Sequence, residues 1–219
     1  MNEADDRETL LLAVLRHVPF DGWSDVAYRA ALAESRVSSE RASILFPNGV
    51  ADSAAYFGRW IVSRLEGELE GLAERESSIR RRIATGVRTL LLMLSPYREA
   101  VRRLSPLDSR RGGVQGMGAL YQAVDAIWRA AGDRATDFSF YTKRGLLVAV
   151  ATSTYFYWLD DESDGYEDTW AFLDRRIEDV MKIQKVRGRI KRFAATMGTP
   201  LDTWQKSPLR EMWRRPSAR

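Results

Sequence analysis

The fold class is decided by the stretch Ile83-Ala84-Thr85-Gly86-Val87-Arg88-Thr89-Leu90-Leu91-Leu92-Met93-Leu94. Its apolar side chains recur every three or four residues, which places them on one face of an α-helix. The same spacing is found in Leu11, Leu12 and Leu15, and the sequence contains no convincing run that alternates at the two-residue period of a strand. The sequence therefore predicts an all-α protein.

Glycine and proline clusters divide this helical pattern into about eight to ten helices. The first three expected helices are short and run from Arg7 to His17, from Ser24 to Ser35 and from Ser38 to Leu45. Ser24 and Ser38 are good N-caps, because a serine hydroxyl accepts a hydrogen bond from a free N–H of the first turn. The single histidine, His17, falls where the first helix is expected to end, so we interpret it as a C-terminal cap.

The second and third helices with the turn between them have the outline of a helix-turn-helix. The segment from Val37 to Asn48 resembles the recognition helix and following turn of a TetR-type repressor. This resemblance implies a TetR-like helical bundle with an N-terminal helix-turn-helix-like module. DNA reading also needs basic residues that neutralise phosphate, and the local charge is nearly balanced. We therefore expect the topology without nucleic-acid binding, and a TetR-type regulator that senses a hydrophobic effector is the alternative.

Composition excludes several kinds of site. The 219 residues, 45% of them hydrophobic, are enough to bury one substantial core, and 34 basic against 30 acidic residues give a net charge of +4. The chain has no cysteine and one histidine, so it has no disulfide framework, thiolate zinc site or cysteine nucleophile. A di-iron carboxylate site with its two Glu-x-x-His motifs is excluded as well. We expect no catalytic residues, no metal and no cofactor.

Basic residues are concentrated at the C-terminus, where eleven stand against two acidic residues after position 181. Between Lys182 and Met197, apolar residues recur at helical spacing among lysines and arginines, which predicts a basic amphipathic helix of the kind that lies on membranes. The residues expected to contact the membrane are Ile183, Val186, Ile190, Phe193, Lys185 and Arg189. An ordinary docked terminal helix has nearly the same pattern.

Two further segments resemble ligand loops but lack essential residues. The loop from Asp160 to Gly165 begins like an EF-hand, yet Ala171 stands where a bidentate glutamate is needed. We expect a solvated loop in which Asp164 caps the next helix. The glycine-rich stretch from Gly112 to Gly118 lacks a following Gly-Lys-Ser/Thr, so we interpret it as a flexible connection to a helix that begins near Ala119.

The segment from Trp128 to Arg144 is the most informative one. It combines Asp133, Asp137, several aromatic residues and the pair Lys143-Arg144, and it leads into the nearly apolar stretch 145–159. These 15 residues are too few to span a bilayer and predict a buried helix. A cation beside exposed aromatics is typical of a lipid-pocket mouth that binds an anionic headgroup. From the residues alone, a capped helix with a packed aromatic core is the favoured interpretation.

The same segment resembles the signature of the lipid-binding accessory family of ubiquinone biosynthesis. The matching residues are Trp128, Gly132, Asp133, Asp137, Phe138, Phe140, Tyr141, Thr142, Lys143 and Arg144. Similar blocks at 17–24, 79–97 and 167–177 extend the resemblance from about Glu8 to Arg192. Phe140 stands where the family often has tryptophan, and Lys143 where it often has arginine.

This resemblance implies a TetR-like fold without repressor function and an apolar cavity that holds an isoprenoid quinone intermediate or a phospholipid. It also implies delivery of substrate to the di-iron demethoxyubiquinone hydroxylase. Arg144 would then approach a lipid headgroup, and Phe140, Tyr141 and Asp137 would face the hydroxylase. We expect the cavity to be lined by helices near Leu90, Leu94, Leu146 and Val150.

The expected organisation has three parts. Residues 1–50 form the helix-turn-helix-like module, 51–181 the lipid-binding helical domain, and 182–219 the basic membrane-surface helix and tail. The N-terminus is acidic and lacks the features of a secretory signal or mitochondrial presequence, so we expect the protein in the bacterial cytoplasm. The basic C-terminal helix predicts a location peripheral to the inner membrane, and the TetR-like resemblance implies a homodimer. A second rival is an enzyme that acts on a lipid headgroup with Asp133, Asp137 and Tyr141.

Overall fold

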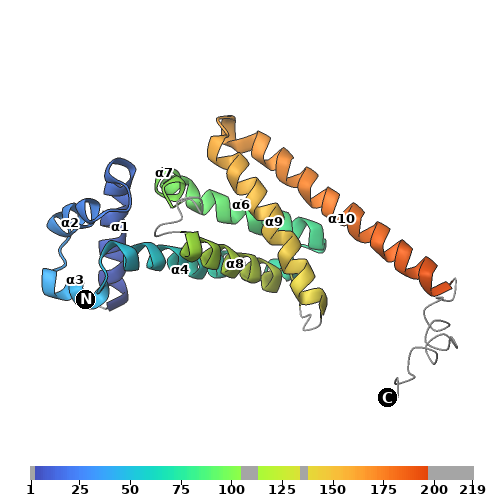
Figure 1. Ribbon diagram of the computed structural model, residues 1–219, viewed down its shortest axis with the longest axis horizontal. Coiled ribbons are helices and arrows are strands. Elements are labelled where there is room, and N and C mark those ends of the chain that lie inside the picture. Colours follow the sequence, from blue (N-terminus) through green and yellow to red (C-terminus); the bar gives the residue numbers. More distant parts are fainter. Residues whose placement is uncertain (1–2, 105–112, 134–137, 197–219) are drawn as a thin grey trace, which may run out of the picture. The chain divides into compact units, whose positions relative to one another are not determined.

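The computed structural model describes residues 3–104, 113–133 and 138–196, without the side chains of 113–117, 138–143 and 183–196. Within these ranges the chain forms ten α-helices, two short 3-10 helices and no strand, which confirms the all-α class (Figure 1). Two compact units are present, residues 1–177 and 178–219. The likeness to TetR repressors and the predicted domain boundaries stay predictions.

The first three helices are α1 (Glu3–Asp21), α2 (Asp25–Glu34) and α3 (Ser39–Leu45). Both predicted N-caps are confirmed, because the hydroxyls of Ser24 and Ser38 accept hydrogen bonds from backbone N–H groups three residues later. The prediction for His17 was wrong. The first helix continues through Pro19 to Asp21, so His17 lies inside it, and its Nε2 is 3.2 Å from the Glu34 carboxylate on α2.

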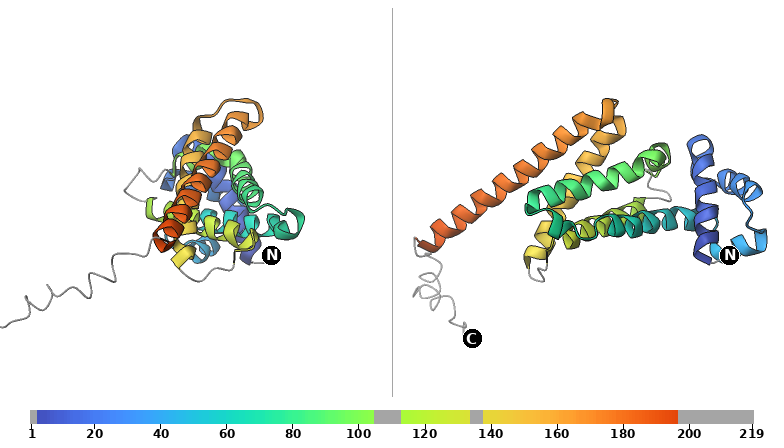
Figure 2. Two further views of the ribbon diagram at one scale, coloured as in Figure 1. Left: turned by 90° about the vertical axis from the view of Figure 1, so that its right-hand side faces the viewer. Right: turned by 180° about the vertical axis from the view of Figure 1, so that it is seen from behind.

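A bundle of longer helices follows, made of α4 (Val50–Glu68), α6 (Ile79–Leu94), α8 (Gly113–Ala130) and α9 (Phe138–Asp160). Helix α8 contacts α4, α6 and α9. Figures 1 and 2 show it running along α4. Short connectors are α5 (Leu72–Arg75), η1 (Ser95–Tyr97) and α7 (Arg98–Arg102). The glycine-rich connection was predicted too long, since α8 already begins at Gly113.

One glycine explains how closely α6 and α8 approach each other. A Cβ atom added to Gly86 would lie 2.6 Å from Ile127 Cγ2, far inside van der Waals contact. Gly86 stands within the apolar stripe that predicted α6, and Ile83, Val87, Leu90 and Leu91 of that stripe are buried. The absent side chain at Gly86 is therefore part of the packing.

The turn between α9 and α10 (Glu167–Thr196) is held by Asp161 and not by Asp164, which corrects the sequence prediction. One Asp161 oxygen accepts from the backbone N–H of Ser163 at 2.8 Å and from its hydroxyl at 2.6 Å. The other accepts from the Thr169 N–H at 2.9 Å and from the Thr169 hydroxyl. Asp164 instead begins the 3-10 helix η2 (Asp164–Tyr166).

We expect acid to weaken the fold through Asp161. Burial raises the pKa of this carboxyl, but the hydrogen bonds from Ser163 and Thr169 lower it further, from 3.8 to about 2. Because the folded pKa is the lower one, the charged carboxylate stabilises the fold fully above the unfolded value, and this contribution is lost as the pH falls from about 4 to 2. The difference in unfolding free energy between wild type and Asp161→Asn should shrink by about 2 kcal/mol over that range. Urea titrations of both proteins at several pH values measure this difference. A difference that does not change with pH would contradict the lowered pKa of Asp161.

Helix α10 extends into the second unit, where Lys182 pairs with Glu178 at 3.1 Å. The side chains of the predicted membrane residues Ile183, Lys185, Val186, Arg189, Ile190 and Phe193 lie outside the described residues. Their role stays a prediction. In the part of the chain that is described, no helix combines the length and the apolar character needed to cross a bilayer.

Candidate functional site

An apolar cavity of about 140 Å³ lies inside the bundle, with walls from α4, α6, α7, α8 and α9. Small side chains on three of these helices form part of its lining, namely Ala54, Ala55, Gly58, Ala119, Ala123 and Ala151. Larger apolar side chains, among them Phe57, Ile61 and Leu91, complete the walls. An apolar cavity of this size admits a molecule as large as benzene.

The structure places the four residues predicted to line the pocket in two groups. Leu90 and Leu94 of α6 line the cavity, whereas Leu146 and Val150 of α9 are not among its lining residues. On α9 the cavity is lined by residues 151, 152, 155 and 156, and a rotation of about 100° per residue turns Val150 away from that face. Lipid binding by all four residues stays a prediction.

The cavity walls carry few polar groups. Among the described lining residues, only Thr152 and Tyr155 have polar side chains, and both belong to α9. The Tyr155 hydroxyl donates to the Val101 carbonyl at 3.2 Å. Burial raises the pKa of Tyr155 to about 12, although the charge of Arg102 opposes the shift, so the phenol stays protonated. The Thr152 hydroxyl oxygen is buried and has no hydrogen-bond partner.

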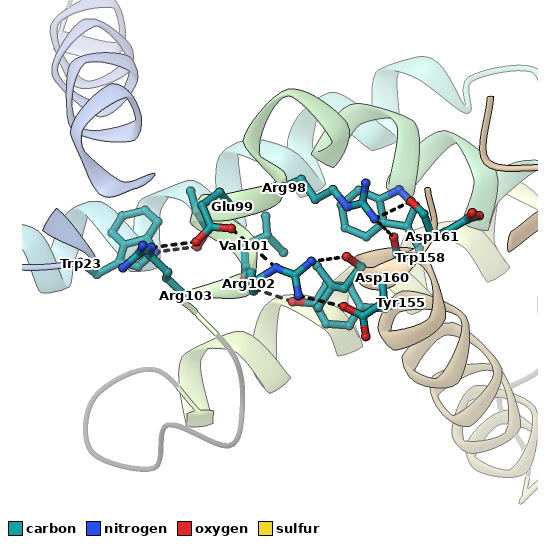
Figure 3. Close-up of polar contacts among 12 residues, drawn as sticks. Trp23, Arg98, Glu99, Val101, Arg102, Arg103, Tyr155, Trp158, Asp160 and Asp161 are labelled. Atoms are coloured by element: carbon teal, nitrogen blue, oxygen red, sulfur yellow. Dashed lines mark hydrogen bonds and ion pairs between the residues drawn. The ribbon is translucent and has the colours of Figure 1, made fainter. Parts of the chain in front are cut away.

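Helix α7 is hydrogen-bonded to the C-terminal end of α9, which borders the cavity (Figure 3). Arg98 donates to the carbonyls of Trp158 and Asp161 at 2.6 and 2.7 Å. Arg102 reaches the Asp160 carboxylate at 2.9 Å and also the Leu159 carbonyl. These bonds satisfy carbonyls that the C-terminus of an α-helix leaves open. The five-residue helix α7 thereby holds the wall to which Val101 and Tyr155 belong.

The same helix contacts the N-terminal helices. Trp23, in the turn between α1 and α2, donates its indole N–H to the Ala100 carbonyl at 2.9 Å. Its ring lies 6.0 Å from that of Phe57, which lines the cavity. The first three helices are therefore joined to the cavity wall by a directional hydrogen bond and by aromatic packing.

Arg144, the predicted headgroup ligand, lies in an ion-pair network. Its side chain is 3% exposed, and its Nε is 2.6 Å from an oxygen of Asp125 on α8. A second guanidinium nitrogen is 3.4 Å from the Asp133 carboxylate. Asp125 also pairs with Arg129, which reaches Glu66 on α4 at 2.6 Å. Arg144 thus links α9 to α8, and a headgroup would have to compete with two carboxylates.

The predicted partner-binding residues are not tested by the structure. Asp137 lies outside the described residues, and Phe140 and Tyr141 belong to the first turns of α9, where side chains are not described. Asp133, proposed for a headgroup-modifying enzyme, pairs with Arg144. The described residues contain no cluster of three or more histidine, aspartate or glutamate side chains placed to hold a metal ion.

Sequence reasoning missed most of the cavity. Ala54 and Gly58 stand four residues apart on α4, and Ala119 and Ala123 stand four apart on α8. Small residues at this spacing share one helix face and allow another helix to approach closely. A Cβ at Gly58 would lie 2.7 Å from that of Ala119, so the two small faces meet. This spacing was visible in the sequence, but it does not say which helices pair.

The sequence of this chain is similar to those of several known proteins. The COQ9 family profile matches residues 114–184, a range that includes nearly all of α8, the whole of α9 with Arg144, and the first part of α10. Over 199 residues, 87% of the chain, it is 32% identical to the mitochondrial ubiquinone biosynthesis protein COQ9 of Rattus norvegicus and 31% identical to that of Homo sapiens. It is 28% identical, over 87% of its length, to the probable ubiquinone biosynthesis protein coq9 of Dictyostelium discoideum.

The chain spans 63%, 62% and 63% of the lengths of these three relatives, so each of them has further sequence outside the shared part. Within the chain, the similarity extends well beyond the residues matched by the family profile. Over most of its length, the chain is therefore similar to members of the COQ9 family.

Proposed function

We propose that this protein is a non-catalytic, lipid-binding accessory protein of ubiquinone biosynthesis. It takes up an isoprenoid quinone intermediate or a phospholipid at the membrane surface, as a homodimer at the bacterial inner membrane. It then presents substrate to the di-iron demethoxyubiquinone hydroxylase through the region of Asp137, Phe140 and Tyr141. Similarity to relatives that are named for ubiquinone biosynthesis supports the pathway.

The apolar cavity is the observation that carries this proposal. Its walls combine aliphatic and aromatic side chains with two hydroxyl groups. The described lining residues do not include a pair of side chains that could act as general acid and general base in catalysis. A polyprenyl tail does not cross water unaided, since shielding several hundred Å² of it is worth roughly 10 kcal/mol at ~25 cal/mol per Å². A protein that handles such a lipid therefore works on the bilayer.

The basic C-terminal segment supplies the contact with that bilayer. Each lysine or arginine held near an anionic leaflet contributes on the order of 1 kcal/mol. Eleven basic residues after position 181, together with Trp204 and Trp213, fit an interfacial segment. The ligand would then pass from the bilayer to the cavity without crossing water.

Filling the cavity should abolish lipid binding. Leu94→Trp places an indole in the space that a ligand needs, and we expect the lipid that copurifies with the protein to fall at least tenfold. Leu92→Trp is the matched control, because Leu92 lies on the same helix but is exposed and does not line the cavity. Organic extraction of natively purified protein followed by mass spectrometry measures both. Equal lipid in Leu94→Trp and Leu92→Trp, or none in wild type, would refute the proposal.

A TetR-type regulator is the alternative function, and the structure gives two arguments against it. Residues 1–50 contain eight acidic and five basic side chains, a net charge of −3 that repels phosphate. Arg41, the basic residue of α3, pairs with the buried carboxylate of Asp6 at 3.0 Å. A gel-shift series across salt concentrations separates the functions, because a specific regulator would keep its operator complex where nonspecific contacts fade.

A further inference from the structure

We propose that the Asn48-Gly49 step is a site of spontaneous covalent modification, at which the Asn48 side chain becomes a carboxylate, and that Asp52 restrains this reaction. The site lies in the turn between α3 and α4, where the N-terminal helices join the bundle. The modification would therefore change the joint between the first three helices and the bundle.

The reaction needs only the chain and water. The backbone nitrogen of Gly49 attacks Cγ of Asn48, so that an N–Cγ bond forms and the Cγ–Nδ2 bond breaks. Nδ2 leaves as ammonia and takes up the proton that the Gly49 nitrogen loses. Water then opens the resulting succinimide at either of its carbonyls, which gives aspartate or isoaspartate. No oxidant or reductant takes part.

The turn combines the two residue types that favour this attack. Asparagine is thermolabile, and a following glycine has no Cβ atom to obstruct ring closure. Asn48 is exposed, and Gly49 has a φ of 56° and a ψ of −121°, a conformation that residues with a Cβ rarely adopt. The backbone of the turn therefore requires glycine after Asn48. The other asparagine of the chain, Asn2, is followed by Glu3.

Hydrogen bonds on both reacting groups oppose the attack. The Asp52 carboxylate accepts from the backbone N–H of Asn48 at 2.8 Å and from its Nδ2 at 3.2 and 3.3 Å. The Gly49 N–H donates to the Phe46 carbonyl at 2.8 Å. Ring closure needs the Gly49 nitrogen free of its proton and oriented toward Asn48 Cγ. The turn must therefore open locally before it reacts, and Asp52 lowers the population of the open form.

The product would repel the residue that restrained the reaction. Conversion replaces the donor Nδ2 with a carboxylate oxygen, so two negative groups would meet where Asn48 now donates to Asp52. Asp52 lies in the first turn of α4, where a negative charge stabilises the helix N-terminus. Isoaspartate also adds a methylene group to the backbone between α3 and α4. The modified chain would therefore hold its first helices less firmly.

The test follows the peptide that contains Asn48 while the full chain is kept at mildly alkaline pH. Proteolysis, chromatography and mass spectrometry measure the aspartate and isoaspartate products. We expect Asp52→Ala to accumulate them about five- to tenfold faster than wild type, as the loss of about one hydrogen bond predicts. Glu68→Ala removes an exposed carboxylate at the other end of α4 and should react at the wild-type rate. Asn48→Ser should not react.

A stability control separates local opening from global unfolding. Trp158→Phe lowers stability at a buried residue of α9 and leaves the turn intact, so it should also react at the wild-type rate. Equal acceleration in Trp158→Phe and Asp52→Ala would overturn the role of Asp52. So would an Asp52→Ala protein that reacts no faster than wild type, or a wild type that reacts as fast as a synthetic peptide of residues 44–54.

The structural consequence has its own measurement. The extra charge allows ion-exchange chromatography to separate modified from unmodified wild-type protein, and hydrogen exchange of residues 44–54 is then compared between the two forms. We expect faster exchange in the modified form. Identical exchange in this segment would contradict the loosened joint.

Discussion

Replacing Arg144 with methionine is expected to lower the free energy of unfolding by about 3–5 kcal/mol. The Arg144 side chain is 3% exposed and lies between the carboxylates of Asp125 and Asp133. Methionine fills much of the volume but removes the positive charge, so two partly buried carboxylates face each other without it. Urea denaturation followed by circular dichroism measures the loss.

The control for Arg144 neutralises the two carboxylates as well. If the cost arises from loss of the positive charge between them, Arg144→Met combined with Asp125→Asn and Asp133→Asn should recover much of the lost stability, because replacing buried ion-pair partners together is far less costly than removing one of them. A single variant that is as stable as wild type but empty of lipid would instead assign Arg144 to the headgroup. Lipid analysis of any Arg144 variant therefore needs this stability measurement beside it.

Trp158→Ala is expected to cost about 3–5 kcal/mol. Trp158 is fully buried at the end of α9, and the Arg98 guanidinium lies 5.4 Å from its ring centre. The rings of Tyr155 and Tyr166 both pack against it at 6.1 Å. Its removal leaves a cavity and loosens the contact between α7 and α9 that Figure 3 shows. The same denaturation experiment measures the effect.

Trp158→Phe separates packing from polarity at this site. The indole N–H of Trp158 is buried without a hydrogen-bond partner, so phenylalanine loses ring volume but no hydrogen bond. We expect a cost of about 1–2 kcal/mol, well below that of alanine. Equal losses for the two variants would mean that the indole N–H, and not the buried ring, stabilises this part of the protein.

Features that depend on a few neighbouring residues could be predicted from the sequence. Ser24 and Ser38 cap their helices because a serine hydroxyl reaches a first-turn N–H three residues later. The stripe from Ile83 to Leu91 is buried because its spacing puts one side of a helix against the core. Leu90 and Leu94 line the cavity from that same helix.

Predictions failed where two local signals competed. The first helix was expected to end at His17, yet it runs through Pro19 to Asp21, and its end at Gly22 is closed by a hydrogen bond from the Gly22 N–H to the Val18 carbonyl. Asp164 was expected to cap the helix that follows it. Instead, the Asp161 carboxylate accepts a hydrogen bond from the N–H of Thr169, eight residues later. Such caps depend on how the chain folds back, and periodicity does not describe this.

By itself, the sequence determined the helical class, the serine caps, the basic C-terminal segment and the absence of cysteine chemistry, because each depends on residue type and short-range spacing. Only the tertiary structure decided that small residues on α4 and α8 meet and that Arg144 lies between two carboxylates. These are contacts between helices far apart in the chain. Helical periodicity shows which side of a helix is apolar, but which helix it meets is decided by the packing of the whole bundle.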